Sequence, residues 1–154
     1  MIFLQYASDI ASEMINIVNI RYTVRENVGE CKKTLNIFGY LSRNNNNSFV
    51  VCTNRILLWA SQNNLDSAKY INETIYHESV HAAQFCRYPN EVTLGIPWAS
   101  MPLPPNKAED VRRSVESVNP NSGFLNTQKR IEHEAYYLED KPAVVKSFLK
   151  TYCL

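Results

Sequence analysis

The chain has 154 residues, which is enough for one globular domain and too few for two of ordinary size. Its formal net charge of +1, without any run of like charges, excludes the basic surface that nucleic acid or an anionic membrane attracts, so we expect neither as a partner. The 45% of apolar residues is typical of a folded globular protein, and one domain over residues 1–154 is expected.

The N-terminal third predicts one amphipathic helix and one strand region. Residues 3–20 carry apolar side chains at helical spacing, and Asp9 and Glu13 interrupt them, which argues against a signal peptide. Without a signal peptide or a stretch of about 20 apolar residues, we expect a soluble chain in the cytoplasm. Residues 28–42 predict a weaker helix. The asparagine-rich tract 43–48 predicts a loop, and the apolar residues 49–59 predict a strand or hairpin.

The rest of the chain predicts helices. Residues 65–87 contain neither glycine nor proline and keep apolar positions at helical spacing, which indicates one long helix. Five of the seven prolines fall in residues 88–105 and indicate an extended loop. Further helices are expected at 106–118, 126–140 and 143–154. The predicted fold is therefore a mainly helical α+β domain, with a short strand or hairpin beside the long helix.

The four cysteines are widely separated and form no C-x-x-C pair, which argues against a cysteine zinc knot or a dithiol redox site. We expect buried thiols. The alternative is a single bridge, for example between Cys86 and Cys153.

The long predicted helix contains the sequence YHESVH, in which His77 and His81 are four residues apart and Glu78 follows the first histidine. Residues at this spacing project from one face of a helix, so both imidazoles can bind the same ion. Imidazole nitrogen suits zinc, and Glu78 is placed to act as general base on a zinc-activated water. The pattern predicts a zinc site with His77 and His81 as ligands.

Two histidines leave the site without its third protein ligand. A third histidine six residues after His81 is absent, because that position is Arg87. The helix at 126–140 offers Glu132, His133 and Glu134, and only one of them can face the metal, since consecutive helical residues diverge by about 100°.

These two segments resemble the gluzincins, a branch of the zincin metallopeptidases. In that family a helix with H-E-x-x-H supplies two histidines and the base, and a later helix supplies a glutamate in an E-x-x-A motif. The sequence EHEA resembles that motif, which favours Glu132 as the zinc ligand. Many members carry Asp, Asn or Glu four residues later to orient a histidine. Tyr136 stands there in this chain, and Glu139 is the candidate replacement.

The resemblance implies a zinc-dependent metallopeptidase that acts on a peptide or protein substrate. It also implies a substrate-binding strand near residues 55–59 and a second donor to the reacting carbonyl, for which Arg130, His133, Tyr136 and Tyr137 are candidates. Gln84 matches the H-E-x-x-H-x-x-Q variant of compact members, or else is a polar residue on the solvated end of the helix. The alternative function is a catalytically inactive zincin-fold protein that binds zinc as a binding or structural module.

Overall fold

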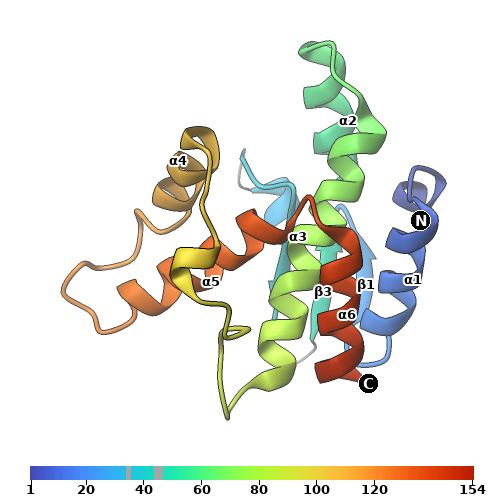
Figure 1. The fold of residues 1–154 in the computed structure, drawn as a ribbon. Helices are drawn as coiled ribbons and strands as arrows, with labels where there is room; N and C mark the ends of the chain where they lie inside the picture. Colours follow the sequence, from blue (N-terminus) through green and yellow to red (C-terminus); the bar gives the residue numbers. More distant parts are fainter. Residues whose placement is uncertain (34–35, 44–46) are drawn as a thin grey trace.

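Helix α3 (Ser67–Arg87) carries the H-E-x-x-H sequence and lies at the centre of the fold (Figure 1). The structure, a computed structural model, describes residues 1–33, 36–43 and 47–154, and it is a mainly helical α+β fold as the sequence predicts. The helix begins where Asp66 accepts a hydrogen bond from the N–H of Ala68, and no glycine or proline interrupts it. Four other helices pack against it: α1 (Asp9–Val18), α2 (Thr53–Gln62), α5 (Leu125–Leu138) and α6 (Pro142–Cys153).

A small sheet covers another side of α3. Within the described residues its strand order is β1-β3-β2; β3 pairs in parallel with β1 and antiparallel with β2. The central strand is buried along its whole length because α3 and other elements cover it. The other two strands lie at the edges of the sheet. The strands are β1 (Thr23–Glu26), β2 (Gly39–Ser42) and β3 (Ser48–Val51).

Edge strand β2 approaches the motif helix most closely at Gly39. A Cβ atom at this position would lie 2.8 Å from Thr74 Cγ2 and 3.1 Å from Glu78 Cγ. Because only glycine leaves this space free, the side chain of Glu78 can lie directly beneath the strand.

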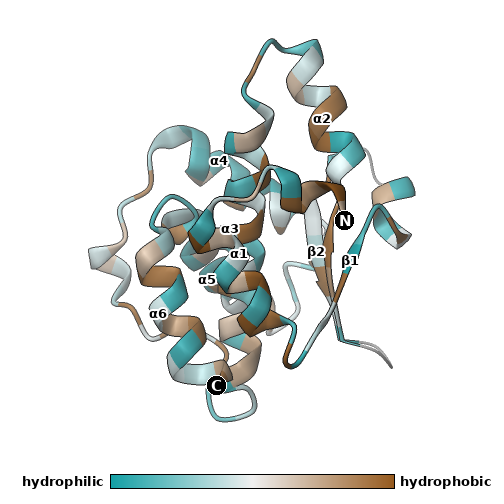
Figure 2. Ribbon diagram, turned by 90° about the vertical axis from the view of Figure 1, so that its right-hand side faces the viewer, coloured by the Kyte–Doolittle hydropathy of each residue, from teal (hydrophilic) through white to brown (hydrophobic). Residues whose placement is uncertain are grey.

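Apolar residues from the sheet and from helices α1, α3 and α6 form the main core. Helix α4 lies at the periphery and is largely hydrophilic, as the teal ribbon in Figure 2 shows. Among the described residues, no helix has both the length and the apolar character that crossing a bilayer requires. The remaining elements are α4 (Pro105–Ser114) and the short 3₁₀ helices η1 (Ile2–Gln5), η2 (Gly29–Lys32) and η3 (Trp98–Ser100).

The helices predicted in the second half of the chain are confirmed as α3 to α6. In the first half, the helix expected over 3–20 is divided, because the Ser8 hydroxyl accepts from the N–H of Ala11 and starts α1 as a new helix. The helix expected over 28–42 is wrong, since this segment contains η2 and strand β2. Of the loop expected over 43–48, residues 44–46 lie outside the described part of the chain.

The strand expected over 49–59 is only half correct. Strand β3 ends at Val51 and helix α2 begins at Thr53, so the predicted substrate-binding strand near 55–59 is wrong. Thr53, Ile56 and Ala60 are the buried residues of α2, and their spacing is helical. The apolar run thus combines a buried strand with the inner face of a helix.

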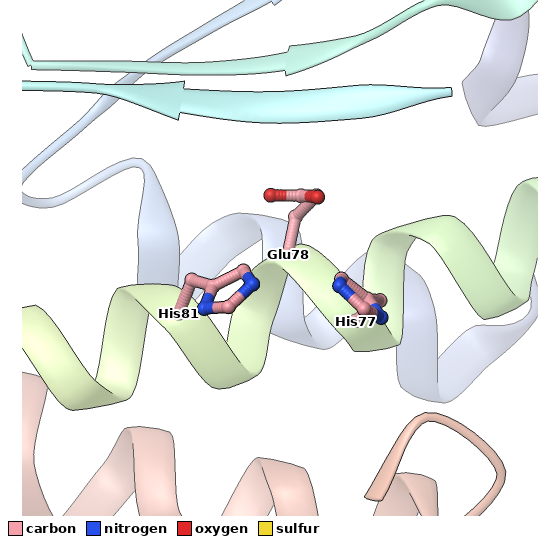
Figure 3. A group of neighbouring side chains, drawn as sticks. All are labelled: His77, Glu78 and His81. Carbon is pink, nitrogen blue, oxygen red and sulfur yellow. The ribbon is translucent and has the colours of Figure 1, made fainter. Parts of the chain in front are cut away.

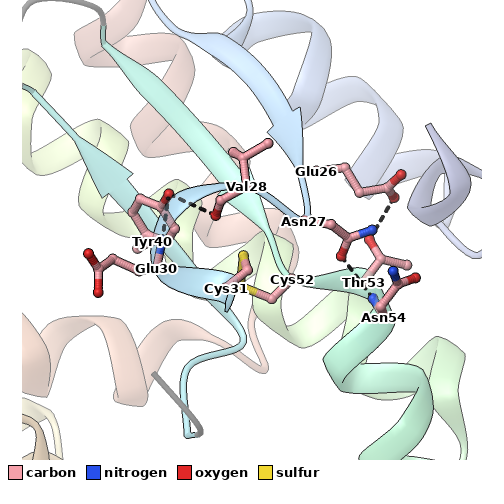
Figure 4. Close-up of a disulfide and its surroundings, with 9 residues drawn as sticks. All are labelled: Glu26, Asn27, Val28, Glu30, Cys31, Tyr40, Cys52, Thr53 and Asn54. Carbon is pink, nitrogen blue, oxygen red and sulfur yellow. Dashed lines mark hydrogen bonds between the residues drawn. A yellow bond between two sulfur atoms is a disulfide. The ribbon is translucent and has the colours of Figure 1, made fainter. Parts of the chain in front are cut away.

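The expectation of free buried thiols is wrong, because all four cysteines form disulfides. Cys86 at the end of α3 is bonded to Cys153 at the end of α6, which is the bridge considered as an alternative. Cys31 is bonded to Cys52, beside the strands (Figure 4). The first bond ties the motif helix to the C-terminal helix, and the second ties η2 to the junction between β3 and α2.

Candidate metal centre

Helix α3 brings His77, Glu78 and His81 together, as their spacing predicts. Both imidazoles project from one side of the helix, and Glu78 extends from the turn between them toward the strands (Figure 3). One ligand atom from each of the three residues lies within 4.8 Å of the others. The two histidines remain 13% and 10% exposed, so the group is recessed but reachable from solvent.

Helix α5 supplies a carboxylate to the same place. Glu132 Oε1 lies 3.1 Å from His81 Nε2, and Glu132 Oε2 lies 3.7 Å from His77 Nε2. Two ligands of a tetrahedral zinc ion with bonds of 2.0–2.1 Å are about 3.3 Å apart, which lies between these two distances. The spacing of the three side chains is therefore suited to zinc.

The other two candidates for the third ligand have different partners. His133 Nε2 is 2.7 Å from the carbonyl oxygen of Met101, and its ring stacks on Trp98 at a centroid distance of 4.3 Å. Glu134 accepts hydrogen bonds from the N–H of Leu94 and from Gln84. Of the three residues, only Glu132 contacts the histidines of α3.

The second nitrogen of each histidine has its own partner. His77 Nδ1 lies 2.8 Å from Glu139 Oε2, so the contact with a histidine that was expected of Glu139 is present. His81 Nδ1 lies 2.8 Å from Gln84 Oε1. Gln84 is completely buried, so the alternative that it lies on the solvated end of the helix is wrong.

These contacts determine which nitrogen of each ring is free. A carboxylate oxygen or amide oxygen can only accept, so the Nδ1 atoms of His77 and His81 carry the hydrogens. Both Nε2 atoms then present lone pairs toward Glu132, which is also an acceptor. A cluster composed of acceptors needs a cation between its members, and this requirement can be met by a metal ion or by protons.

The pKa shifts of these residues also indicate that a positive charge belongs between the histidines and Glu132. Burial lowers the pKa of His77, but hydrogen bonds with Glu132 and Glu139 raise it more strongly, so the pKa lies well above its ordinary value. Burial raises the pKa of Glu132, yet the neighbouring His81 and His77 outweigh this effect and hold that pKa below the usual range. The site thus stabilises positive charge between these groups.

Glu78 lies in a different environment from Glu132. Burial raises its pKa, and the positive charge of His81 and His77 only partly opposes this. A raised pKa makes a carboxylate a stronger base near neutral pH. No hydrogen bond holds Glu78 against one of the histidines in the way that Glu139 holds His77, so it is placed to exchange a proton.

A sequence comparison places the chain in a family. The profile of the family described as "Domain of unknown function (DUF8637)" matches residues 3–154. The chain belongs to this family. No curated protein and no solved structure matches it.

The DUF8637 chain also has a residue at this site that no sequence pattern indicates. Lys107 of α4 places its ammonium group 3.4 Å from Glu139 Oε1 and donates to the carbonyl oxygen of Tyr136. Lys107 and Glu139 are far apart in sequence, and nothing in the pattern of α4 distinguishes this lysine from a solvated one. Only the packing of α4 on α5 brings it to the centre.

A separate hollow of about 530 Å³ lies over the strands and includes none of the candidate ligands. Its lining residues include Arg25, Glu30, Tyr40 and Arg43. The candidate metal centre therefore lies between α3 and α5 and is not part of this hollow.

Proposed function

We propose that this chain is a zinc-dependent metallopeptidase of the gluzincin type, with His77, His81 and Glu132 as zinc ligands. The observation that supports it best is the meeting of the Glu132 carboxylate with the Nε2 atoms of both H-E-x-x-H histidines. The donor set of two imidazoles and one carboxylate is one that catalytic zinc uses, with a fourth position left for water or substrate. When bound, zinc polarises that water and the carbonyl group of the substrate.

Glu78 is the general base in this proposal. Its carboxylate accepts a proton from the attacking water and returns it to the leaving nitrogen of the cleaved peptide bond. The burial that raises its pKa makes both transfers favourable near neutral pH. The contact with Gly39 keeps the side chain beneath strand β2, on the side from which a peptide would approach.

The outer edge of β2, which pairs with no other strand in the described part of the chain, is the proposed binding site for the substrate backbone. The N–H of Cys52 donates to the carbonyl oxygen of Phe38, and hydrogen-bonded positions alternate along antiparallel strands. Tyr40 therefore bonds inward to β3, and Gly39 and Leu41 direct their N–H and C=O groups outward. An extended peptide that pairs with Gly39 and Leu41 lies above Glu78.

Among the candidate donors to the reacting carbonyl, we favour Tyr136 over His133 and Tyr137. Its ring lies 4.5 Å from that of His77, whereas His133 is bonded to Met101 and the ring of Tyr137 is covered by Lys141. Burial, followed by the negative charge of Glu132, raises the pKa of Tyr136, so its hydroxyl keeps its hydrogen at neutral pH. A protonated hydroxyl can donate to an oxygen that becomes negative.

The test combines zinc content with peptide hydrolysis. Glu78→Gln is expected to retain zinc and to lower kcat/KM roughly 10²–10⁴-fold, because a general base contributes about that much. Glu132→Ala is expected to lose zinc. The exposed Glu116→Gln is the matched control and leaves both properties unchanged.

The same experiment separates the two functions that the sequence allows. Stoichiometric zinc with no cleavage of a peptide library supports the inactive binding or structural module. Wild-type protein without zinc, or hydrolysis that Glu78→Gln does not change, contradicts the metallopeptidase.

A further inference from the structure

A buried chain of hydrogen bonds connects the metal centre to the proline-rich loop that follows α3. From His81 it passes through the side chain of Gln84 to Glu134 of α5, and from there to the backbone of Leu94. Gln84 is completely buried and Glu134 is only 2% exposed. None of these contacts is needed to supply a zinc ligand, so they require another explanation.

The orientation of the Gln84 amide is determined by its partners. Its nitrogen donates to the carbonyl oxygen of Ile131 at 3.0 Å and to Glu134 Oε1 at 2.8 Å. Both partners are acceptors, so the amide nitrogen must face them and the amide oxygen must face His81. Turning the amide over would bring its oxygen against two other oxygens.

Glu134 is suited to holding the amide of Gln84 in place, because every hydrogen-bond partner of its carboxylate is an N–H donor. Both of its oxygens accept from the N–H of Leu94 at 2.9 Å, and Oε1 also accepts from Gln84. A buried carboxylate is costly unless such donors surround it, and an apolar side chain would fill the space without that cost. A polar network buried in this way fixes one arrangement when all its members are satisfied.

We propose that Glu134 and Gln84 are positioning residues for the metal centre. Glu134 holds the amide of Gln84 in one orientation, and Gln84 in turn keeps the hydrogen of His81 on Nδ1 and the lone pair of Nε2 directed at the metal. This inference rests on the proposed zinc centre and assigns to it a supporting pair that acts only through His81. The same carboxylate holds the loop residue Leu94, which couples the loop to the centre.

The test measures zinc affinity by competition with a chromophoric chelator, on protein that is shown to be folded without zinc by circular dichroism. Gln84→Met keeps the volume of the side chain and removes the acceptor. Loss of such an outer contact typically weakens metal binding roughly 10–100-fold, which is the expected result. Glu134→Gln is expected to weaken zinc binding in the same direction, because its amide presents a donor to groups that are themselves donors.

Two readouts distinguish positioning from a general loss of structure. The double variant Gln84→Met with Glu134→Gln is expected to bind zinc no more weakly than Gln84→Met alone, since Glu134 acts through Gln84. In long-range ¹H–¹⁵N spectra of the zinc-loaded protein, His81 is expected to carry its hydrogen on Nδ1 in the wild type and to lose this uniform state in Gln84→Met. The exposed residues Gln128 and Glu116 supply matched controls, Gln128→Met and Glu116→Gln, with unchanged affinity.

Three outcomes overturn the inference. Folded Gln84→Met with wild-type zinc affinity removes the role of Gln84, and losses that multiply in the double variant show that Glu134 does not act through it. Wild-type protein that binds no zinc overturns the metal centre and this inference together. Because Gln84→Met leaves Glu134 bonded to the loop, its result decides the matter even if Glu134→Gln does not fold.

Discussion

Gly39→Ala is the substitution that most directly tests how the sheet positions Glu78, the proposed general base. The added methyl carbon would lie 2.8 Å from Thr74 Cγ2, 2.9 Å from the carbonyl oxygen of Val50 and 3.1 Å from Glu78 Cγ. One of these neighbours is backbone and cannot turn away, so either strand β2 or the Glu78 side chain must move.

The expected size of the effect follows from this crowding. Overpacking of a well-packed site typically costs about 1–3 kcal/mol. For a domain of this length that corresponds to a decrease in melting temperature of roughly 2–12 °C. If Glu78 moves, hydrolysis also decreases while the zinc content is retained, because His77, His81 and Glu132 are not displaced.

The assay compares thermal melting, zinc content and peptide hydrolysis in the wild type and three variants. Gly123→Ala is the matched control, since a Cβ atom there meets nothing within 4 Å. Adding Thr74→Ser to Gly39→Ala removes the nearest methyl group and retains a hydroxyl that can bond to the Tyr70 carbonyl, so it should restore part of the stability. Gly39→Ala that melts and hydrolyses like the wild type would refute the packing of β2 on Glu78.

Three further predictions concern the disulfides, pH and zinc. Replacing Cys86 and Cys153 by alanine should lower the free energy of unfolding by about 4 kcal/mol, and replacing Cys31 and Cys52 should lower it by about 3 kcal/mol, because of the lengths of the loops that the two disulfides close. Chemical denaturation measures both changes. Four free thiols in the wild-type protein, found by mass spectrometry, would contradict both predictions. In zinc-free protein, the raised pKa of His77 contributes its full stabilisation of the fold below pH 6.5, the ordinary pKa of histidine. This stabilisation is lost as the pH rises through the raised pKa of His77 in the folded protein. A melting temperature that stays constant from roughly pH 6 to 9 would contradict this prediction. His77→Ala should lower the melting temperature more in zinc than in chelator, because the bound metal stabilises only the folded state, and equal decreases would argue against bound zinc.

The candidate site was predicted from the sequence more completely than the fold around it. Helical spacing alone places His77 and His81 on one face. A separation of seven residues, about two helical turns, likewise relates Glu132 of α5 to Glu139 at the C-terminal end of that helix. The choice of Glu132 over its neighbours needed the resemblance to the gluzincins. Its contacts with both histidines depend on how α5 crosses α3, which no local pattern shows.

The wrong predictions for residues 28–42 and for the cysteines have physical causes. Strand β2 is only four residues long, and it follows Gly29, Lys32 and Lys33 in a segment that is weakly helical by composition. The cysteines are separated by 21 and 67 residues along the chain, so their pairing depends entirely on tertiary structure. Two disulfides are typical of proteins from oxidising compartments, which weighs against the cytoplasmic location expected from the sequence.

The charge of the candidate metal centre explains why residue 84 is a glutamine and not a glutamate. Three carboxylates contact or adjoin the two histidines, namely Glu78, Glu132 and Glu139, and Lys107 lies against the last of them. With the three carboxylates ionised and both histidines neutral, these groups would carry two negative charges, and a divalent cation would neutralise them. A fourth carboxylate beside His81 would leave an uncompensated negative charge in a buried place, where it is costly. An amide accepts the same hydrogen bond without that charge, so the asymmetry between Glu139 at one histidine and Gln84 at the other fits the proposed zinc centre.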